Sequence, residues 1–450
     1  MRVAFNAWFW NHPETGSGQY TRRLVEGLVA LQADLQIVLV IPTDKGQGTG
    51  SENQVGAHPS GCVQHGCVQH GCVQHSCPED DLPQHPAYVL HPVPCPRSRL
   101  GKVQFEQILF PQACARLGAD VAHVPYWAPP LVHSTPTVVT IHDLIPLLLP
   151  EYRGGPLVRL YTALVSAGAH SAAQILTDSR ASRRDILAHL GLPPEHVKVI
   201  YLAASERYAQ ATPPSTEEKC RDAPLGLRAT RLRATRLRAT RLPNGEDAVR
   251  ARYRLPERYM LYLGGFDVRK NVATAIGTYR WAGPAIGEEC PLVIAGRLPE
   301  RDTPFTPDPR RLAREQGVDE RFMRFTGFVE EAHKPALYRG AVAFIFPSLY
   351  EGFGLPPLEA LACGTPVVGS ATSSIPEVVG DAGVLLPPDD AEGMARALIQ
   401  LATDADFHAE LSHRALVQAS HFSWKRAARE TWAAYQQAEL HPSPSMGKTR

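Results

Sequence analysis

The sequence predicts an α/β protein built from two doubly wound, parallel-sheet domains that face a central cleft. Short apolar runs of strand length alternate with helical stretches, and this series stops at an irregular stretch, 205–250, and then resumes. Such alternation places helices on both faces of a parallel sheet. The chain of 450 residues is also longer than a single hydrophobic core usually supports. We therefore expect two domains and a linker.

The first series of elements occupies residues 1–204, the expected N-terminal domain. Its strands are expected at residues 2–8, 36–42, 87–93, 121–126, 137–143, 173–179 and 197–203. Between them, helices are expected at 19–31, 104–118 and 182–190, where apolar residues recur three or four positions apart.

The second series occupies residues 251–420, the expected C-terminal domain. Its strands are expected at residues 259–265, 291–296, 321–328, 341–347 and 365–370. A helix is expected from about Pro357 to Gly364, because proline suits a first helical turn and glycine ends a helix. Residues 421–438 read as a terminal amphipathic helix, and 439–450 as a disordered tail.

Composition excludes several classes of protein. Hydrophobic residues make up 44% and charged residues 20% of the chain, as in ordinary soluble proteins. A net charge of +1 gives no general attraction to nucleic acid. The N-terminus lacks a signal-peptide pattern, and no apolar run reaches the ~18 residues of a spanning helix. The nine cysteines show no disulfide spacing. We expect a cytoplasmic protein, with peripheral contact at the inner face of a membrane left open.

Two low-complexity segments interrupt the pattern, and both repeat every five residues. Residues 61–77 repeat Gly-Cys-Val-Gln-His and offer Cys and His spacing that could ligate zinc, but an expanded loop explains them as well. Residues 227–242 repeat Leu-Arg-Ala-Thr-Arg and could touch anionic lipid or nucleic acid. A solvated, disordered linker is the simpler interpretation.

One acidic motif points to chemistry. In "FPSLYEGFGLPPLEALACG", Glu351 follows a predicted buried strand, and Glu359 is expected in the first turn of the next helix. The backbone N–H groups at this helix start can hold a phosphate, and the carboxylates suit sugar hydroxyls. The three residues expected to supply these N–H groups are Phe353, Gly354 and Leu355. The alternative is that Glu359 only caps its own helix.

A basic pair follows the first strand of the second domain. In "LYLGGFDVRKNV", Arg269 and Lys270 lie on a loop before a helix expected to start near Asn271. Two cations in this position can neutralise a diphosphate leaving group, as a metal ion does in other enzymes. Adjacent basic residues before a helix can also be merely solvated.

The string "EGFGLPPLEALACGTPVV" resembles the Glu-x7-Glu signature of glycosyltransferase family 4, the retaining group 1 glycosyltransferases with a GT-B fold. The resemblance extends over most of the chain. It implies that Glu351 contacts the transferred sugar and Glu359 the ribose hydroxyls. It also implies a diphosphate-binding role for Lys270 and for Arg269, although many members carry Gly-Arg where this chain has Gly264-Gly265.

The same resemblance assigns residues in the first domain. Gly16 and Gly18 resemble the family's glycine-rich loop that faces the donor, although a plain turn explains the pattern as well. His142 matches the histidine that hydrogen-bonds the transferred sugar, and Asp143 is expected to accompany it as an acceptor-side or orienting residue. In the second domain, Phe328 and Val329 lie where the family's backbone meets the nucleotide base.

These observations together predict a hexosyltransferase. We expect it to move a mannose- or glucose-type sugar, with retention, from a nucleoside diphosphate donor to a glycan, lipid-linked or small-molecule acceptor. No cofactor and no metal are expected, nucleic acid is not an expected partner, and the oligomeric state is left open. The alternatives are a nucleotide-sugar epimerase or phosphorylase on the same fold, or a catalytically silent sugar-nucleotide-binding scaffold.

Overall fold

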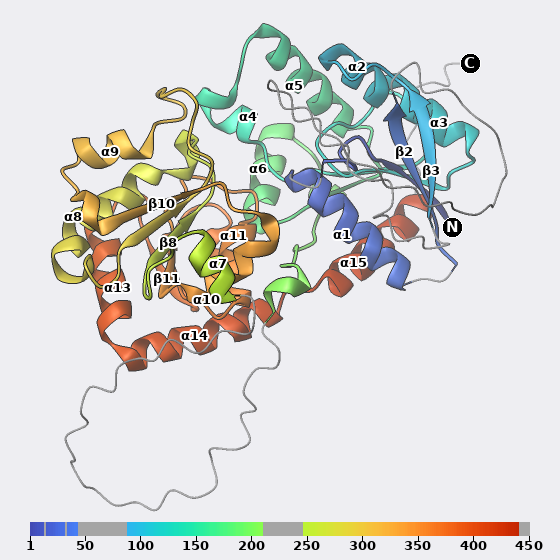
Figure 1. Cartoon of the computed structure of the whole chain (residues 1–450). Helices are drawn as coiled ribbons and strands as arrows, with labels where there is room; N and C mark the ends of the chain where they lie inside the picture. The colour runs from blue at the N-terminus through green and yellow to red at the C-terminus, as the bar shows by residue number, and fades with distance from the viewer. Residues whose placement is uncertain (13–14, 32–33, 44–87, 210–245, 441–450) are drawn as a thin grey trace, which may run out of the picture.

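The computed structural model describes residues 1–12, 15–31, 34–43, 88–209 and 246–440. Figure 1 shows two α/β units, each with a parallel sheet between layers of helices, and the second unit begins with α7 (Glu246–Arg252). The predicted fold class is confirmed. The repeats at 61–77 and 227–242 and nearly all of the expected tail lie outside the described residues.

The N-terminal sheet has seven parallel strands in the order β3-β2-β1-β4-β5-β6-β7. Each lies within a few residues of an expected position. The strands are β1 (Arg2–Asn6), β2 (Gln36–Thr43), β3 (Tyr88–Pro94), β4 (Val121–Val124), β5 (Thr137–Thr140), β6 (Gln174–Thr177) and β7 (Val197–Val199). The order reverses direction between β1 and β4, and ligands of such sheets bind at that reversal, beyond the carboxyl ends of the strands.

The C-terminal sheet has six parallel strands in the order β10-β9-β8-β11-β12-β13. They are β8 (Met260–Leu263), β9 (Leu292–Ala295), β10 (Met323–Gly327), β11 (Ala343–Phe346), β12 (Val367–Ser370) and β13 (Gly383–Leu386). The edge strand β13 was not predicted, although it is a short apolar run, and all four of its residues are half-buried. The order reverses between β8 and β11, so the loops after these two strands lie side by side.

Helices cover both faces of the N-terminal sheet. They are α1 (Gly16–Leu31), α2 (Arg99–Gln104), α3 (Phe110–Arg116), α4 (Ile145–Leu148), α5 (Pro156–Ala169) and α6 (Arg180–Leu190), with single turns η2 (Phe105–Leu109), η3 (Pro150–Tyr152), η4 (Pro194–His196) and η5 (Glu206–Tyr208). The helix expected at 104–118 is present, but it begins earlier, at Arg99, and includes the π turn η2 between α2 and α3. Pro111, which lacks an N–H group for the helical ladder, lies in the first turn of α3 directly after this π turn.

Helices of the C-terminal unit follow the same plan. They are α8 (Val272–Ile286), α9 (Pro309–Glu315), α10 (Lys334–Gly340), α11 (Leu355–Ala362), α12 (Ile375–Val379), α13 (Ala391–Thr403), α14 (Ala405–Ser420) and α15 (Trp424–Leu440), with η6 (Val268–Lys270), η7 (Glu320–Phe322) and η8 (Glu331–His333). The last helix, α15, lies on the N-terminal unit beside α1 (Figure 1). There the Tyr435 hydroxyl hydrogen-bonds the ring of His123 in β4 at 2.6 Å.

The two units share part of one hydrophobic core. Phe353, Leu358 and Val378 of the C-terminal unit belong to the same buried cluster as Leu24 and Leu28 of α1. The Phe353 ring is 5% exposed and lies 5.9 Å from the ring of Phe422. Burying a side chain of this size stabilises the fold by about 1.5–3 kcal/mol. The loop that carries Glu351 is therefore anchored to both units.

Among the described residues, no helix is long and apolar enough to cross a bilayer. In the same part of the chain, no three His, Cys, Asp or Glu side chains are grouped to hold a metal ion.

Candidate active site

Glu351 joins the two basic residues of the neighbouring loop. Its carboxylate accepts hydrogen bonds from Arg269 Nη1 and from Lys270 Nζ, both at 2.7 Å, and its side chain is 9% exposed. The contact exists because the loops after β8 and β11 are adjacent. Burial opposes ionisation, but the charges of Lys270 and Arg269 hold the pKa of this carboxyl below its ordinary value.

The two cations are held by the loop as well as by the carboxylate. Arg269 Nη1 also donates to the Tyr350 carbonyl at 2.9 Å, and the Lys270 ammonium lies 5.3 Å from the centre of the Phe346 ring. Their side chains are only 14% and 15% exposed. Neither is a solvated surface residue, so that alternative is wrong. The prediction placed them on a diphosphate and Glu351 on the sugar, whereas here all three form one cluster.

The backbone around Glu351 is fixed by serines of both units. Ser373 accepts from the Glu351 N–H at 2.9 Å, and Ser374 donates to the Glu351 carbonyl at 2.9 Å. From the N-terminal unit, the hydroxyls of Ser179 and Ser182 donate to the Gly352 carbonyl at 2.6 and 3.0 Å. The carboxylate of Glu351 is therefore presented by a loop with little freedom to move.

Gly352 brings this loop against the N-terminal unit. A Cβ atom at this position would lie 2.6 Å from the carbonyl oxygen of His142, so no other residue fits. The Ser182 hydroxyl lies within hydrogen-bonding distance of both this His142 carbonyl, at 2.8 Å, and the Gly352 carbonyl. Two residues predicted from distant parts of the sequence, His142 and Glu351, are thereby brought to one junction.

His142 is paired with an acidic residue that was not predicted as a partner. Its Nδ1 lies 2.5 Å from Asp178 Oδ2, and its Nε2 lies 3.2 Å from the Pro125 carbonyl oxygen. Both partners are acceptors, so both hydrogen bonds form together only when both ring nitrogens carry protons. Burial alone would lower the pKa of His142, but the Asp178 carboxylate raises it above its ordinary value.

Asp143 points into the same junction. Its Oδ1 accepts from the Ile145 N–H at 3.0 Å, which shapes the turn into α4. Burial raises the pKa of its carboxyl, and the charge of Glu351 adds to that rise, whereas Arg269 opposes it. Its expected orienting role remains a prediction, which its place between His142 and Glu351 favours.

Glu359 lies apart from this cluster, on the wall of a second part of the cleft. It is the fifth residue of α11, past the first turn, so it does not cap its helix as the alternative required. Its Oε2 accepts from the Tyr338 hydroxyl at 3.1 Å, and it is 8% exposed. Burial raises the pKa of this carboxyl to about 7, although Lys334 opposes the rise.

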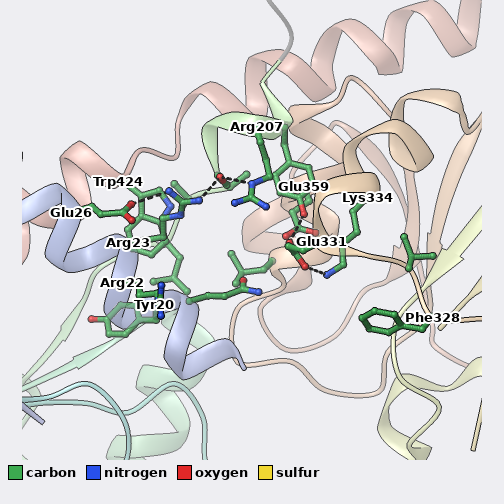
Figure 2. Close-up of a pocket in the computed structure, with 18 residues that line it drawn as sticks. Tyr20, Arg22, Arg23, Glu26, Arg207, Phe328, Glu331, Lys334, Glu359 and Trp424 are labelled. Carbon is green, nitrogen blue, oxygen red and sulfur yellow. Dashed lines mark hydrogen bonds and ion pairs between the residues drawn. The ribbon is translucent and has the colours of Figure 1, made fainter. Parts of the chain in front are cut away.

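Glu359 faces a cavity of about 510 Å³ between the two units. Figure 2 shows Glu359, Glu331, Lys334 and Phe328 on one side, with Tyr20, Arg22, Arg23 and Trp424 opposite. The predicted base-binding residues line it as well. The Phe328 ring is 59% exposed with the Arg297 guanidinium 5.2 Å from its centre, whereas Val329 is buried. This cavity is suited to a flat aromatic ligand that also carries hydroxyls.

The start of α11 leaves backbone donors free. Gly354 precedes the helix at φ +108°, a conformation that favours glycine, and Pro356 and Pro357 carry no N–H group. Within the described residues, the N–H groups of Phe353, Gly354 and Leu355 donate no hydrogen bond. The phenyl ring of Phe353 packs into the core, so only its backbone remains for a ligand.

The glycines of the first loop differ in purpose. Gly16 begins α1 with open space around its Cα. A Cβ atom on Gly18 would lie 2.1 Å from the His12 carbonyl oxygen, so this glycine is required by packing of its own loop. Packing within its own loop therefore explains why residue 18 is glycine. The predicted contact with the donor is better suited to Gly16.

Three residues of the junction were not among the predicted site residues. Asp178 and Ser182 follow β6, next to β5 in the sheet, and Glu377 lies on α12 of the other unit. The carboxylate of Glu377 accepts from the N–H groups of Arg180 and Ala181 at 2.8 and 2.7 Å. The available signal was the polar string "TDSRAS" directly after a buried strand, where parallel sheets collect functional side chains.

Two family descriptions match the chain, one over most of each unit. Residues 15–203 match "Glycosyl transferase 4-like domain", and residues 257–404 match "Glycosyl transferases group 1". The "O-antigen chain mannosyltransferase B" of Escherichia coli is 32% identical over 66% of this chain and 69% of its own length. The "Serotype-specific mannosyltransferase WbdA" of Escherichia coli is 31% identical over 65% of this chain, which corresponds to only 32% of that longer protein.

Solved structures resemble the whole architecture. A sucrose-phosphate synthase from Thermosynechococcus elongatus superposes with a TM-score of 0.65 at 19% identity, over 97% of this chain and 98% of that one. The Anabaena protein Alr3699/HepE in complex with UDP-glucose superposes with a TM-score of 0.62 at 15% identity, over 96% of this chain and 100% of that one. At such identities the likeness concerns the fold alone.

Proposed function

The chain belongs to the group 1 glycosyltransferases with family 4-like N-terminal domains, and from that membership we propose that it transfers a mannose-type hexosyl group from a nucleoside diphosphate sugar to a glycan acceptor. It is a glycosyltransferase of GT-B fold. The choice of mannose rests on the mannosyltransferase names of its relatives. Retention of anomeric configuration and independence of metal belong to the same proposal.

The cluster of Glu351, Arg269 and Lys270 carries this proposal. It combines two buried cations with one carboxylate at the reversal point of the C-terminal sheet, where nucleotide ligands of such sheets bind. Two cations are balanced better by the negative charge of a diphosphate than by that of a single carboxylate. The free N–H groups at the start of α11 add neutral donors beside it.

Donor binding would then rearrange this cluster. The diphosphate takes over Arg269 and Lys270, and the carboxylate of Glu351 is freed to accept hydrogen bonds from the hydroxyls of the transferred sugar. The nucleoside extends into the cavity beside Glu359, where the carboxylate accepts from the ribose hydroxyls and the base lies near Phe328 and Val329. The two glutamates thus contact opposite ends of one donor.

The transfer step needs little covalent participation by the protein. The acceptor hydroxyl attacks the anomeric carbon on the face that the diphosphate leaves, the bond from that carbon to the diphosphate oxygen breaks, and the departing phosphate takes the hydroxyl proton. Arg269 and Lys270 stabilise the charge that develops on the leaving group. His142, held by Asp178 through Nδ1, exchanges the contact of its Nε2 with the Pro125 carbonyl for a hydrogen bond to the transferred sugar.

An epimerase or phosphorylase is the remaining candidate reaction on this fold. We would incubate the enzyme with GDP-mannose, UDP-glucose and ADP-glucose and measure nucleotide release with and without a mannan-oligosaccharide acceptor. If the enzyme is a transferase, nucleotide release should depend on the presence of the acceptor. Conversion of the donor without any acceptor would instead indicate an epimerase.

A thermal-shift screen of the same donors identifies the nucleotide independently of the acceptor. A ligand present at 100 times its Kd adds about 2.7 kcal/mol to stability, which gives a clear rise in Tm. Stabilisation by no nucleotide sugar would contradict the proposal. Stabilisation without transfer to any acceptor tested would favour the alternative of a catalytically silent sugar-nucleotide-binding scaffold.

A further inference from the structure

A group of exposed apolar side chains covers one face of the N-terminal unit, which we call the α2–α5 face. Its members are Leu100, Ile108, Leu131, Val132, Leu157, Val158 and Leu160. Three of them protrude strongly, since Leu157 is 81%, Leu100 82% and Leu160 69% exposed. Among the described residues these seven are nearly half of the large apolar side chains that are exposed. Such clustering marks an interaction surface rather than chance.

The segments that carry these residues are contiguous. Tyr161 of α5 donates to Glu106 of η2 at 2.9 Å and accepts from Lys102 of α2 at 3.1 Å. Gln107 of η2 bonds the backbone of the 129–131 loop, with its amide donating to the Pro129 carbonyl at 3.1 Å. Figure 1 shows α2 and α5 together along the top edge of the N-terminal unit.

The charge around the α2–α5 face is one-sided. In residues 97–108, 129–134 and 151–164, the exposed charged side chains are Arg97, Arg99, Arg153, Arg159 and Glu151. Glu106 is fully buried and is paired with Lys102. The first turn of α5 contains no acidic residue and has no side-chain cap. A chain of net charge +1 therefore concentrates positive charge where it exposes apolar side chains.

From this juxtaposition we propose that the α2–α5 face docks on an anionic phospholipid bilayer. The leucines enter the boundary between headgroups and acyl chains, and the arginines bind lipid phosphates at its rim. The charge favours this occupant over a second copy of the chain, because a symmetric contact would bring like-charged arginines together.

The position of the face relative to the cleft suits this role. The turn before α5 contains Tyr152, whose hydroxyl donates to Asp267 of the C-terminal unit, two residues from Arg269. Phe305, 39% exposed, packs on the Tyr152 ring at 4.9 Å between ring centres and extends the apolar surface across the cleft. A bilayer on the α2–α5 face therefore lies beside the cleft entrance. The docking itself is independent of the proposed reaction.

The test is co-sedimentation of the full chain with vesicles of phosphatidylglycerol and phosphatidylcholine, compared with phosphatidylcholine alone. We expect binding to the anionic vesicles that weakens with added salt. Leu157→Asp with Leu160→Asp should abolish it. Arg153→Gln with Arg159→Gln should weaken it roughly 25-fold, since each basic residue near an anionic surface adds about 1 kcal/mol, or fivefold.

The control double variant, Trp281→Asp with Val417→Asp, changes exposed apolar residues of the C-terminal unit and should bind like the unchanged protein. Equal Tm values show that all variants are folded. Absence of vesicle binding, or equal loss in the control, would overturn the proposal. So would a change in sedimentation velocity without lipid for the leucine variant, which would identify the face as a contact between copies.

Discussion

At the scale of single residues, Glu351 balances the charges of Arg269 and Lys270 before any donor arrives. This suggests a test that removes its charge and preserves its shape. In Glu351→Gln the two cations are released for a diphosphate, so affinity for free nucleoside diphosphate should stay the same or rise. The variant also loses the charged contact between the Glu351 carboxylate and the transferred sugar, so kcat should fall roughly 100-fold. Calorimetric titration and steady-state kinetics check both, and a loss of nucleotide affinity would contradict the proposed division of roles.

For Glu359 we expect the opposite of the result for Glu351, because its substitution should weaken nucleotide binding. We also expect donor binding to depend on the protonation of Glu359. Ribose hydroxyls donate to the ionised carboxylate, and the pKa of Glu359 is raised to about 7 by burial between Tyr338 and Tyr208, with Lys334 and Glu331 nearby. Below that pKa the ionised form of Glu359, which binds the ribose, is scarce. The donor Kd should therefore rise about tenfold for each pH unit of acidification. Above pH 8 it should be constant.

The matched variant Glu359→Gln should remove this pH dependence and weaken nucleotide binding by roughly 1.5–3 kcal/mol, as expected for a hydrogen bond to a charged group. A Kd that is flat between pH 6 and 8 in the unchanged enzyme would refute the assignment.

The pair of His142 and Asp178 can be tested through the pH at which the His142 imidazolium loses its proton. Asp178 raises the pKa of His142, so the imidazolium persists to higher pH in the unchanged enzyme than it would without this carboxylate. Asp178→Asn keeps a hydrogen-bond partner but removes the charge. The alkaline limb of the kcat profile should then move to lower pH while the KM for donor changes little. A uniform fall in kcat at every pH would show that Asp178 acts only in packing.

At the scale of elements, local sequence predicted most strands and several of the helices, because each of these has its own periodicity. It failed where an element depends on its neighbours. β13 is a strand because β12 offers an open edge, and the helix expected at 104–118 contains a π turn before Pro111 that its apolar spacing does not reveal. Glu359 was expected in the first turn, but α11 already begins at Leu355.

The start of α6 is held by the other unit, which gives a prediction at this scale. Glu377 accepts from two of the first N–H groups of α6 and from the Tyr201 hydroxyl at 3.0 Å. Glu377→Ala leaves these donors without their acceptor and should cost about 0.5–2 kcal/mol, as the loss of a helix cap does. It should also lower kcat, because Ser179 and Ser182 fix the Gly352 carbonyl from this helix.

Glu392→Ala is the matched control for this variant. Glu392 forms an exposed pair with Arg396 on α13, of a kind that contributes at most about 1 kcal/mol. Melting temperatures and kcat of the two variants should therefore differ. If they agree, the contact of Glu377 with α6 has no role in positioning the loop of Glu351.

At the scale of the whole molecule, the candidate site could be predicted only in part. Residues that share a motif, such as Glu351 and Glu359, were found together, and so was the pair Arg269 and Lys270. Contacts between the two units were not predicted, because Ser182 and Glu377 acquire these partners only when the units meet. The pairing of Asp178 with His142 lies within the N-terminal unit and depends on the adjacency of β5 and β6. A single sequence carries no periodic signal for such contacts.

The connections between elements permit a last test. Residues 44–87 join β2 to β3, which are adjacent parallel strands, so the chain must return along the length of a strand. Such a crossover needs a dozen or more residues. Deleting 61–75 leaves 29 of the 44 connecting positions, which is ample. The change in loop-closure free energy should stay below about 0.6 kcal/mol, the value for a halving of length. Tm and transfer rate should therefore match those of the full chain. A stoichiometric zinc content that disappears with the deletion, together with a lower Tm, would show instead that the Cys-His repeat is a structural metal site.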